Sequence, residues 1–482
     1  MNKKIAKNYF YNLSYQVLMV IVPLITTPYV SRVLQASGVG LFGYTQTIAV
    51  AFSLFAALGI NNYGQREIAY YQDDRQERSR IFWELFIVRL ITTSIVALIY
   101  IIFSLSYKDY TRYLIGQGLI VVGTILDISW LFGGMEDFRT IAIRNIFVRS
   151  ATVILIFILV KSRNDVLIYI LINSISTILS YALFFVQLKK YVDWVELGKL
   201  RIFRHIKGSI EFFIPLIATQ LYSHLDKIML GAMIDSKVES GYYEQARKIV
   251  NIVILVLTSI NAVMYPRISK LYKEGASNEI KNDYMITFRI IVMLMLPITV
   301  GLFVIAPDFT LWFFGQGYDG VPVLIRLSCL LLVFMAVGNF VGVQYLSPMG
   351  KQNKMTIIYI ISAVINLILN AVLIPYCYST GAMIASIIAE AFSCFSQVYL
   401  FKKSEYSITL LYGTWKYFVA TFIMAAIITV FHIHCRHLTT TLLLMIEMIL
   451  GMVVYFAVLL ISEDEMIQAG LTKVLHRIRK DR

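Results

Sequence analysis

Long apolar runs separated by short polar segments are the main pattern of this chain. The runs recur at a length of roughly 20 residues, which crosses a bilayer as a helix. Six precede a polar, basic stretch near residue 200, six follow it, and two more lie toward the C-terminus. The predicted spans are 11–33, 40–62, 83–107, 110–132, 141–160, 166–188, 208–233, 241–266, 284–306, 321–346, 355–376, 380–401, 417–434 and 439–462. The pattern predicts an all-α polytopic membrane protein with about 14 transmembrane helices.

The composition agrees with this pattern. Hydrophobic residues make up 58% of the 482 residues and charged residues only 15%, whereas soluble domains are about 25% charged. The net charge of +14 would suggest nucleic acid for a soluble protein, but in a membrane protein the same excess collects on cytoplasmic loops. We therefore expect no nucleic-acid partner. The four cysteines have no C-x-x-C spacing, so we expect neither a disulfide framework nor a zinc site.

The basic residues also predict the orientation. Of the 43 Lys and Arg residues, 29 fall in loops on the side of the N-terminus, six on the other side and eight within the spans. Because cytoplasmic loops are enriched in Lys and Arg, both termini are predicted to face the cytoplasm. An odd number of spans would break this pattern, in which the Lys and Arg residues collect in the loops on one side of the membrane.

A local repeat relates the two halves of the chain. The words PLITT at 23–27 and PLIAT at 215–219 align at an offset of 192, and Ser31 then falls opposite Ser223. Transporters are commonly built from such repeats, although a chance match of short apolar words is the alternative. The predicted regions are an N-terminal lobe at 1–190, an interfacial linker at 191–207, a C-terminal lobe at 208–402, two appended helices within 403–462 and an amphipathic cytoplasmic tail at 463–482. We thus expect two pseudo-symmetric six-helix lobes around a central cavity.

Several motifs resemble a known family. They are PYVSRVL at 28–34, GVGLFG at 38–43, LDKIMLG at 225–231, GYYEQARK at 241–248 and MYPRIS at 264–269. With them the chain resembles, nearly end to end, bacterial Wzx-type polysaccharide or oligosaccharide flippases of the multidrug/oligosaccharidyl-lipid/polysaccharide exporter superfamily. The resemblance implies a protein of the bacterial cytoplasmic membrane that moves a polyprenyl-diphosphate-linked oligosaccharide, such as a capsule or O-antigen repeat unit, from the inner to the outer leaflet by alternating access. It also implies membrane lipids and other polysaccharide assembly proteins as partners.

Three other functions stay open. A lipid II flippase shares the architecture and the anionic lipid, so only the sugars of the substrate differ. A cation-coupled multidrug exporter of the same superfamily is disfavoured, because it would call for an acidic pocket. A polytopic polysaccharide polymerase would need a large catalytic loop with placed acids or bases, and the longest external loop is only about 306–320.

Basic residues within the spans are candidates for the substrate site. Arg32, Lys227, Arg247 and Lys248 lie on spans 1, 7 and 8, which the resemblance places beside the cavity. A charge in the bilayer normally faces a bundle interior or a wet cavity, and Arg binds phosphate oxygens through paired charge-assisted bonds. These four residues are therefore predicted to bind the diphosphate, with snorkelling toward a helix end as the alternative.

Acidic and histidine side chains in or near the spans are candidates for a gate or for ion coupling. We single out Asp226, His224, Asp127 and Glu84. Such acids are able to bind a coupling H⁺ or Na⁺, but pairing with a basic residue explains them equally well, and Arg89 is predicted to pair with Glu84 or Asp127. For His224 a hydrogen-bonded structural role is the alternative to a titrating switch.

Other motifs do not indicate chemistry. Gly38-x-Gly40-x-x-Gly43 fits a dinucleotide pattern, but no strand precedes it, so a tight turn with close helix approach is expected. The sequence contains no Walker A motif. His432 and its neighbours in the last external loop suit a polar loop better than a metal site. We expect a transporter without catalytic residues, bound metal or cofactor, apart from a coupling ion.

Overall fold

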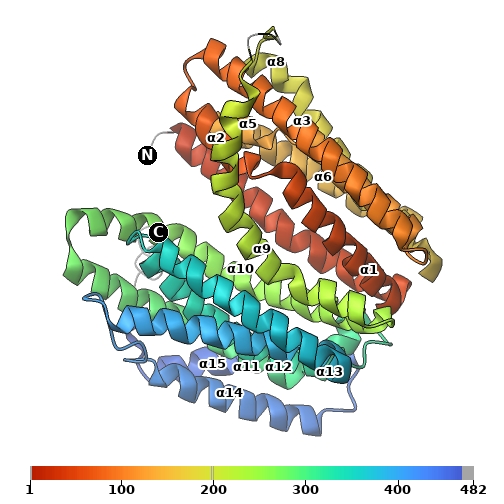
Figure 1. Ribbon diagram of the computed structural model, residues 1–482. Helices are drawn as coiled ribbons and strands as arrows, with labels where there is room; N and C mark the ends of the chain where they lie inside the picture. The colour runs from red at the N-terminus through yellow and green to blue at the C-terminus, as the bar shows by residue number, and fades with distance from the viewer. Residues whose placement is uncertain (1–2, 197, 199, 469–482) are drawn as a thin grey trace, which may run out of the picture. The chain divides into compact units, whose positions relative to one another are not determined.

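The computed structural model describes residues 3–196, 198 and 200–468, and side chains throughout these except 3–20, 218, 219 and 221–223. All regular structure in the described residues is helical, as Figure 1 shows. The chain divides into two compact units, residues 1–244 and 245–482, and the division falls within α10. The predicted boundary between the lobes, at 191–207, stays a prediction.

The first unit is built from long helices joined by short turns. Its helices are α1 (Lys3–Ala57), α2 (Ile60–Tyr70), α3 (Arg75–Ser106), α4 (Thr111–Gly123), η1 (Thr124–Leu126), α5 (Ser129–Gly134), α6 (Phe138–Leu159), η2 (Arg163–Asp165), α7 (Val166–Ala182), η3 (Leu183–Gln187), α8 (Leu188–Tyr191), η5 (Ile202–His205) and α9 (Ile206–Met233), followed by the start of α10. Helix α1 packs against α3, α4, α6 and α9, and α4 packs against α7.

The second unit consists of α10 beyond residue 244 and the helices that follow it. Their bounds are α10 (Lys237–Glu274), α11 (Ser277–Phe314), α12 (Val321–Asn339), the π-helical η6 (Phe340–Leu346), α13 (Gln352–Lys402), α14 (Trp415–His434) and α15 (Thr440–Ile461). Helix α12 packs against α11 and α13, while α14 and α15 pack against each other and against α11.

Two of the longest helices are broken where the sequence predicts a turn between spans. Gln35 in α1 has φ 59° and ψ 174°, and Tyr378 in α13 has φ 50° and ψ −131°. Neither residue is helical, so each helix consists of two segments that meet at a sharp bend. Ten helices in the described residues are long and apolar enough to cross a membrane, and Thr111–Leu126 is shorter. Counting each broken helix as two segments gives 12, and Thr111–Leu126 together with α9, whose side chains are described only in part, is compatible with 14 spans.

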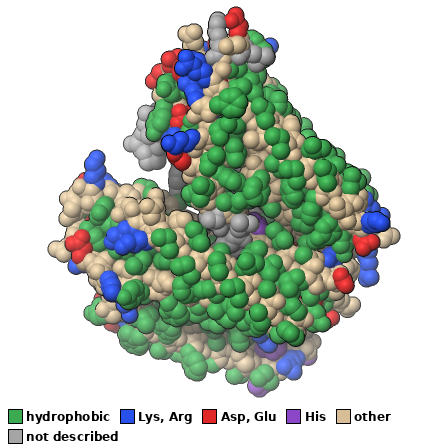
Figure 2. All heavy atoms as spheres, in the orientation of Figure 1, with side chains coloured by type: hydrophobic (Ala, Val, Ile, Leu, Met, Phe, Trp, Pro, Cys, Tyr) green, Lys and Arg blue, Asp and Glu red, His purple; other side chains and the backbone are tan. Residues whose placement is uncertain are grey.

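The surface of the helices matches a lipid environment. Large apolar side chains are exposed along α3, α6 and α14, including Leu98, Ile102, Phe147 and Phe422, and hydrophobic side chains cover much of the face in Figure 2. A soluble protein rarely exposes contiguous apolar area of this extent. The all-α polytopic fold class is therefore confirmed.

Aromatic residues form the core at one end of the first unit. Phe82 of α3 stacks on Trp130 of α5, and Phe132 stacks on Phe184 of η3. In the predicted linker that follows this core, residues 192–196 form no regular structure. The predicted amphipathic tail lies largely outside the described residues, which end at 468.

Candidate functional site

Helices α9 and α10 bring four of the motif residues together. Lys227 and Glu244 form an ion pair with Nζ and Oε2 2.6 Å apart. The Tyr243 hydroxyl donates to Asp226 Oδ2 at 2.5 Å. Residues 226–227 and 243–244 lie about equally far from the turn between the helices, so the antiparallel hairpin places them level. We call these four residues the α9–α10 cluster.

Glycines let the cluster lie against α1. The Cβ of a residue other than glycine at position 43 would be 3.1 Å from Glu244 Oε2. At positions 40 and 241 the added Cβ would lie 1.8 Å from the Lys237 carbonyl oxygen and 1.9 Å from that of Ala36. At Gly231 it would overlap the Tyr44 ring. The close helix approach predicted for the glycine motif is thus confirmed, and it joins α1 to the α9–α10 hairpin.

Lys237, the first residue of α10, belongs to the same region. Its Nζ donates to the carbonyl oxygens of Gly231 at 2.6 Å and Ile234 at 3.1 Å, which caps the end of α9. The ammonium group also lies 4.8 Å from the Tyr44 ring centre and 4.9 Å from that of Tyr110. The sequence signal for this role was the position of Lys237 shortly after the C-terminal end of α9.

The other predicted phosphate ligands lie on α1 and α10. Arg32 is exposed on α1, where its carbonyl oxygen accepts a bond from Gln35 Nε2 at the bend. Arg247 and Lys248 are half-buried on α10 in the second unit, and His224 is half-buried on α9.

Glu84 on α3 fixes the segment before α9. One carboxylate oxygen accepts from the Arg204 guanidinium and the His205 ring, each at 2.7 Å, and the other accepts from the Arg201 amide at 2.6 Å. Arg80 Nε lies 3.3 Å away. Three hydrogen bonds and the Arg80 ion pair surround this fully buried carboxylate, and they give Glu84 a structural role.

His205 bridges this group to α2. Its Nε2 faces Glu84, and its Nδ1 lies 2.9 Å from the Tyr63 hydroxyl. Burial lowers the pKa of His205 and outweighs the opposing effect of the Glu84 carboxylate. A neutral ring that donates from Nε2 and accepts the Tyr63 proton at Nδ1 satisfies every group in this arrangement.

Asp127 is held in a second buried group, at the break between η1 and α5. It lies 3.5 Å from Arg89 Nη2, accepts from Asn61 Nδ2 at 3.2 Å and caps the Ser129 amide at 3.1 Å. Arg89 Nη1 also donates to the Asp127 carbonyl oxygen and to Asn61 Oδ1, both at 2.8 Å. Of the two partners predicted for Arg89, Asp127 is the one that the structure pairs with it.

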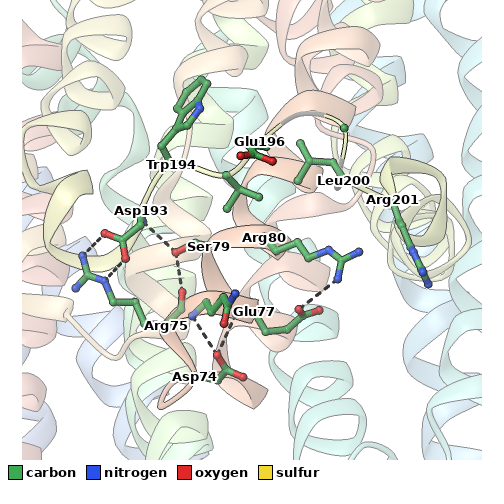
Figure 3. A pocket seen from close by; sticks show the side chains of 13 residues that line it. Asp74, Arg75, Glu77, Ser79, Arg80, Asp193, Trp194, Glu196, Leu200 and Arg201 are labelled. Atoms are coloured by element: carbon green, nitrogen blue, oxygen red, sulfur yellow. Dashed lines mark hydrogen bonds and ion pairs between the residues drawn. The ribbon is translucent and has the colours of Figure 1, made fainter.

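A groove of about 820 Å³ lies where the N-terminal end of α3 meets residues 193–196, 198, 200 and 201. Figure 3 shows that its charged side chains largely face one another. Arg75 donates to both carboxylate oxygens of Asp193, at 2.6 and 2.7 Å, and Arg80 lies 3.8 Å from Glu77. The Arg75 guanidinium lowers the pKa of the exposed Asp193 carboxyl. Four acids and three arginines line the groove, so it offers no focus for an anion.

The second unit has a polar core that the sequence analysis missed. Asn261 of α10 donates to Asn339 at 3.2 Å and accepts from Gln344 Nε2 at 2.8 Å. Amide side chains join helices in membrane proteins in this way. The signal was the presence of amide residues inside otherwise apolar runs.

Helices α14 and α15 hold a separate titratable pair. His432 Nδ1 lies 2.9 Å from Glu447 Oε1 and 3.6 Å from Asp308 Oδ2. His434 instead contacts the Val430 carbonyl oxygen. Within the described residues, no group of three or more His, Cys, Asp and Glu side chains is arranged to hold a metal ion.

Together the broken helices, the exposed apolar surfaces and the glycine contacts define a multi-pass helical membrane protein. Residues 5–272, more than half of the chain, match the family described as polysaccharide biosynthesis protein, and residues 212–372 match the MatE family. The chain therefore belongs to the polysaccharide biosynthesis protein family, and its resemblance to Wzx-type flippases of the multidrug/oligosaccharidyl-lipid/polysaccharide exporter superfamily is confirmed.

Relatives and solved structures agree with this assignment. The chain is 26% identical to a "Putative O-antigen transporter" of Shigella dysenteriae over 76% of this chain and 92% of the relative. A protein of the same name from Escherichia coli (strain K12) is 24% identical over 77% and 90%. The fold is similar to an inward closed conformation of the lipid II flippase MurJ, with a TM-score of 0.74 and 15% identity over 95% of this chain and 100% of that chain. An inward-facing multidrug resistance MATE family transporter has a TM-score of 0.60 and 15% identity over 79% and 97%. The relatives are transporters or flippases and not enzymes, as predicted.

Proposed function

We propose that this protein moves a polyprenyl-diphosphate-linked oligosaccharide from the inner to the outer leaflet of a bacterial cytoplasmic membrane by alternating access, with both termini in the cytoplasm. The observation that carries the proposal is the similarity to O-antigen transporters across three quarters of the chain. Lys and Arg side chains on the broken and glycine-packed helices supply the positive charge that a diphosphate requires.

In this proposal Arg32, Lys227, Arg247 and Lys248 bind the diphosphate. Lys227 lies beside Glu244, so it would exchange a carboxylate for phosphate oxygens when substrate is bound. Asp226 and His224 then act near this exchange as gate residues. The contacts of Asp127 and Glu84 support structural roles for these two acids instead.

The driving force is part of the same proposal. Export of an anion from an inside-negative cell is favoured by about 2.3 kcal/mol per charge per 100 mV. A coupling ion, H⁺ or Na⁺, would add to this.

Deletion of the gene in its host tests the proposal. We expect a polyprenyl-linked oligosaccharide to accumulate in extracted lipids and to be cleared by the wild-type gene and by the control variant Arg163→Ala, which changes an exposed residue of η2. Arg32→Ala and Lys227→Ala should leave the lipid uncleared. Unchanged lipid pools would overturn the proposal.

The same lipid extracts distinguish the proposed substrate from the alternative substrates. The MurJ-like fold favours lipid II as the second candidate substrate. Accumulation of lipid II without any other polyprenyl-linked glycan would favour that substrate, and unchanged lipids together with increased drug sensitivity would favour a multidrug exporter.

A further inference from the structure

Two pockets follow one another between α11, α14 and α15, which pack together in the second unit (Figure 1). The inner pocket, of about 420 Å³, is lined by apolar side chains such as Leu302, Met424 and Met452, and by Glu447. The outer pocket, of about 700 Å³, lies closer to the loop that joins α14 to α15, and charged side chains are part of its lining. Binding pockets in proteins commonly have volumes of about 300–1,000 Å³. Along these helices an apolar pocket is thus followed by a polar one, in the order of the tail and the headgroup of a lipid.

Glu447 gives the inner pocket one polar atom that lacks a partner. The side chain is fully buried, and its Oε1 lies 2.9 Å from His432 Nδ1. Its Oε2 has no hydrogen-bond partner in the described part of the chain. The other oxygen-bearing side chain of the lining is satisfied, because the Tyr455 hydroxyl donates to the Met293 carbonyl oxygen at 2.8 Å. A buried oxygen without a donor costs free energy, so a ligand that donates a hydrogen bond to Oε2 would be stabilised here.

The outer pocket contains two arginines that form no ion pair with any described residue, Arg326 of α12 and Arg436 of the loop after α14. Arg326 Nε donates to the Phe303 carbonyl oxygen at 3.2 Å, and the guanidinium lies 5.5 Å from the centre of the Phe303 ring. Arg436 is exposed. Guanidinium groups bind phosphate oxygens through charge-assisted hydrogen bonds. The outer pocket therefore offers two groups that suit a phosphate.

Negative charge lies beside these arginines. Asp308 Oδ2 of α11 lies 3.6 Å from His432 Nδ1, which is the nitrogen that also faces Glu447. One imidazole carries at most one positive charge, so a net negative charge remains around His432 as long as both acids are ionised. Groups of both signs thus lie close together where the outer pocket meets the inner one. This arrangement matches a headgroup that carries a phosphate and an ammonium group.

We propose that the two pockets form one site for an aminophospholipid of the phosphatidylethanolamine type. Arg326 and Arg436 hold its phosphate, Asp308 and Glu447 accept from its ammonium group, and an acyl chain occupies the inner pocket. Because the loop after α14 is predicted to be external, the lipid belongs to the outer leaflet. All of these residues lie in the second unit, and the inference does not rest on the proposed function.

Lipid binding to the purified, delipidated full-length protein tests the site, with native mass spectrometry as the measurement. Four ligands are compared: phosphatidylethanolamine, phosphatidylcholine, whose quaternary ammonium donates no N–H bond, phosphatidylglycerol, which has no amine, and farnesyl diphosphate as a short polyprenyl diphosphate. Arg326→Gln/Arg436→Gln removes the phosphate ligands and Glu447→Gln removes the buried charge. Arg163→Gln removes an arginine charge from an exposed turn as the matched control.

Gly301→Leu tests the inner pocket without removing any charge. Gly301 lines this pocket, and an added Cβ would meet only Met424 Cε, at 4.0 Å. A leucine side chain should therefore fill the pocket without displacing the backbone. We expect this variant to unfold at the temperature of the wild type or above it, so a loss of lipid binding would not reflect a loss of folding.

We expect the wild type to bind phosphatidylethanolamine roughly tenfold more tightly than phosphatidylcholine, since hydrogen bonds to charged groups are lost with the latter. The double arginine variant, Glu447→Gln and Gly301→Leu should each weaken binding of phosphatidylethanolamine by a similar factor, and Arg163→Gln should not. Tighter binding of phosphatidylglycerol would overturn the assigned headgroup, and tighter binding of farnesyl diphosphate would assign the site to a polyprenyl diphosphate instead. Equal affinity of the wild type and all variants would overturn the site. Because binding is measured and not export, this result is independent of the gene deletion.

Discussion

Replacing Lys227 by Met tests whether the α9–α10 cluster holds the first unit together. In the structure, Lys227 and Glu244 approach to 2.6 Å with side chains only 17% and 11% exposed. At an effective dielectric constant near 20, two unit charges at this distance attract by about 6 kcal/mol, part of which offsets their desolvation. Lys227→Met removes this partner from a carboxylate that stays buried beside Gly43. We expect the variant to lose about 3–5 kcal/mol of stability.

The double variant Lys227→Met/Glu244→Gln separates the loss of charge from the loss of shape. Exchange of a buried ion pair for neutral groups of similar size is often nearly neutral, so the double variant should regain most of the lost stability. Thermal unfolding in detergent, followed by tryptophan fluorescence, measures both variants, with Lys161→Met at an exposed position as the control. A single variant that unfolds together with the wild type would refute the reasoning.

Export by the same double variant then distinguishes structure from substrate binding. If Lys227 only neutralises Glu244, the refolded double variant should clear the accumulated lipid as the wild type does. If Lys227 also binds the diphosphate, the double variant should be as stable as the wild type but should not clear the lipid.

Three further predictions concern packing, protonation and the second unit. Gly241→Ala should destabilise the protein by about 1–3 kcal/mol, because the added Cβ would lie 1.9 Å from a backbone carbonyl oxygen of α1. The control Gly198→Ala should not, since no atom lies within 4 Å of the added Cβ there. Equal melting temperatures of the two variants would contradict this prediction. Burial lowers the pKa of His205 below its ordinary value of 6.5, so the unfolded chain takes up the proton first as the pH falls. The stability contributed by the neutral ring is complete above about pH 6.5 and decreases as the pH falls toward the lowered pKa. Between about pH 7.5 and about pH 5.5, the melting temperature should therefore fall more steeply for the wild type than for His205→Gln. Equal pH dependence of the two melting temperatures would speak against this role of His205. Asn261→Leu should cost about 1–2 kcal/mol in thermal unfolding, because Gln344 loses its acceptor, and an unchanged melting temperature would argue against the network.

The positions of the turns were predictable because they follow from hydropathy and glycine. The runs ending near residue 33 and resuming near 40 placed a turn there, and the bend at Gln35 lies within it. The second such bend, at Tyr378, lies between two predicted spans. The sequence also gave the reason for glycine at positions 40 and 43, since close approach needs residues without a side chain. It did not indicate that the carbonyl oxygen of Lys237 is the group approached.

Pairings across long separations were beyond the reach of the sequence. Glu84 was a candidate for coupling because an acid in a span needs an explanation, but its partners Arg204 and His205 lie about 120 positions further along. Hydropathy gives the depth of a residue and not its direction around the helix axis. The same limit left Arg89 with two possible acids until the break at Asp127 brought that carboxylate beside it.

The distribution of charge within the first unit bears on how a membrane potential would act. Lys227 with Glu244 and Arg89 with Asp127 are each neutral as pairs, so they carry no net charge through the field when the unit moves. A diphosphate that displaces Glu244 from Lys227, as proposed above, would instead bring its own negative charge into the unit. An inside-negative potential favours the outward movement of that charge by about 2.3 kcal/mol per charge per 100 mV if it crosses the whole field. The voltage dependence would then lie in the step that carries the substrate outward, and the return of the empty, re-paired site would depend little on the potential.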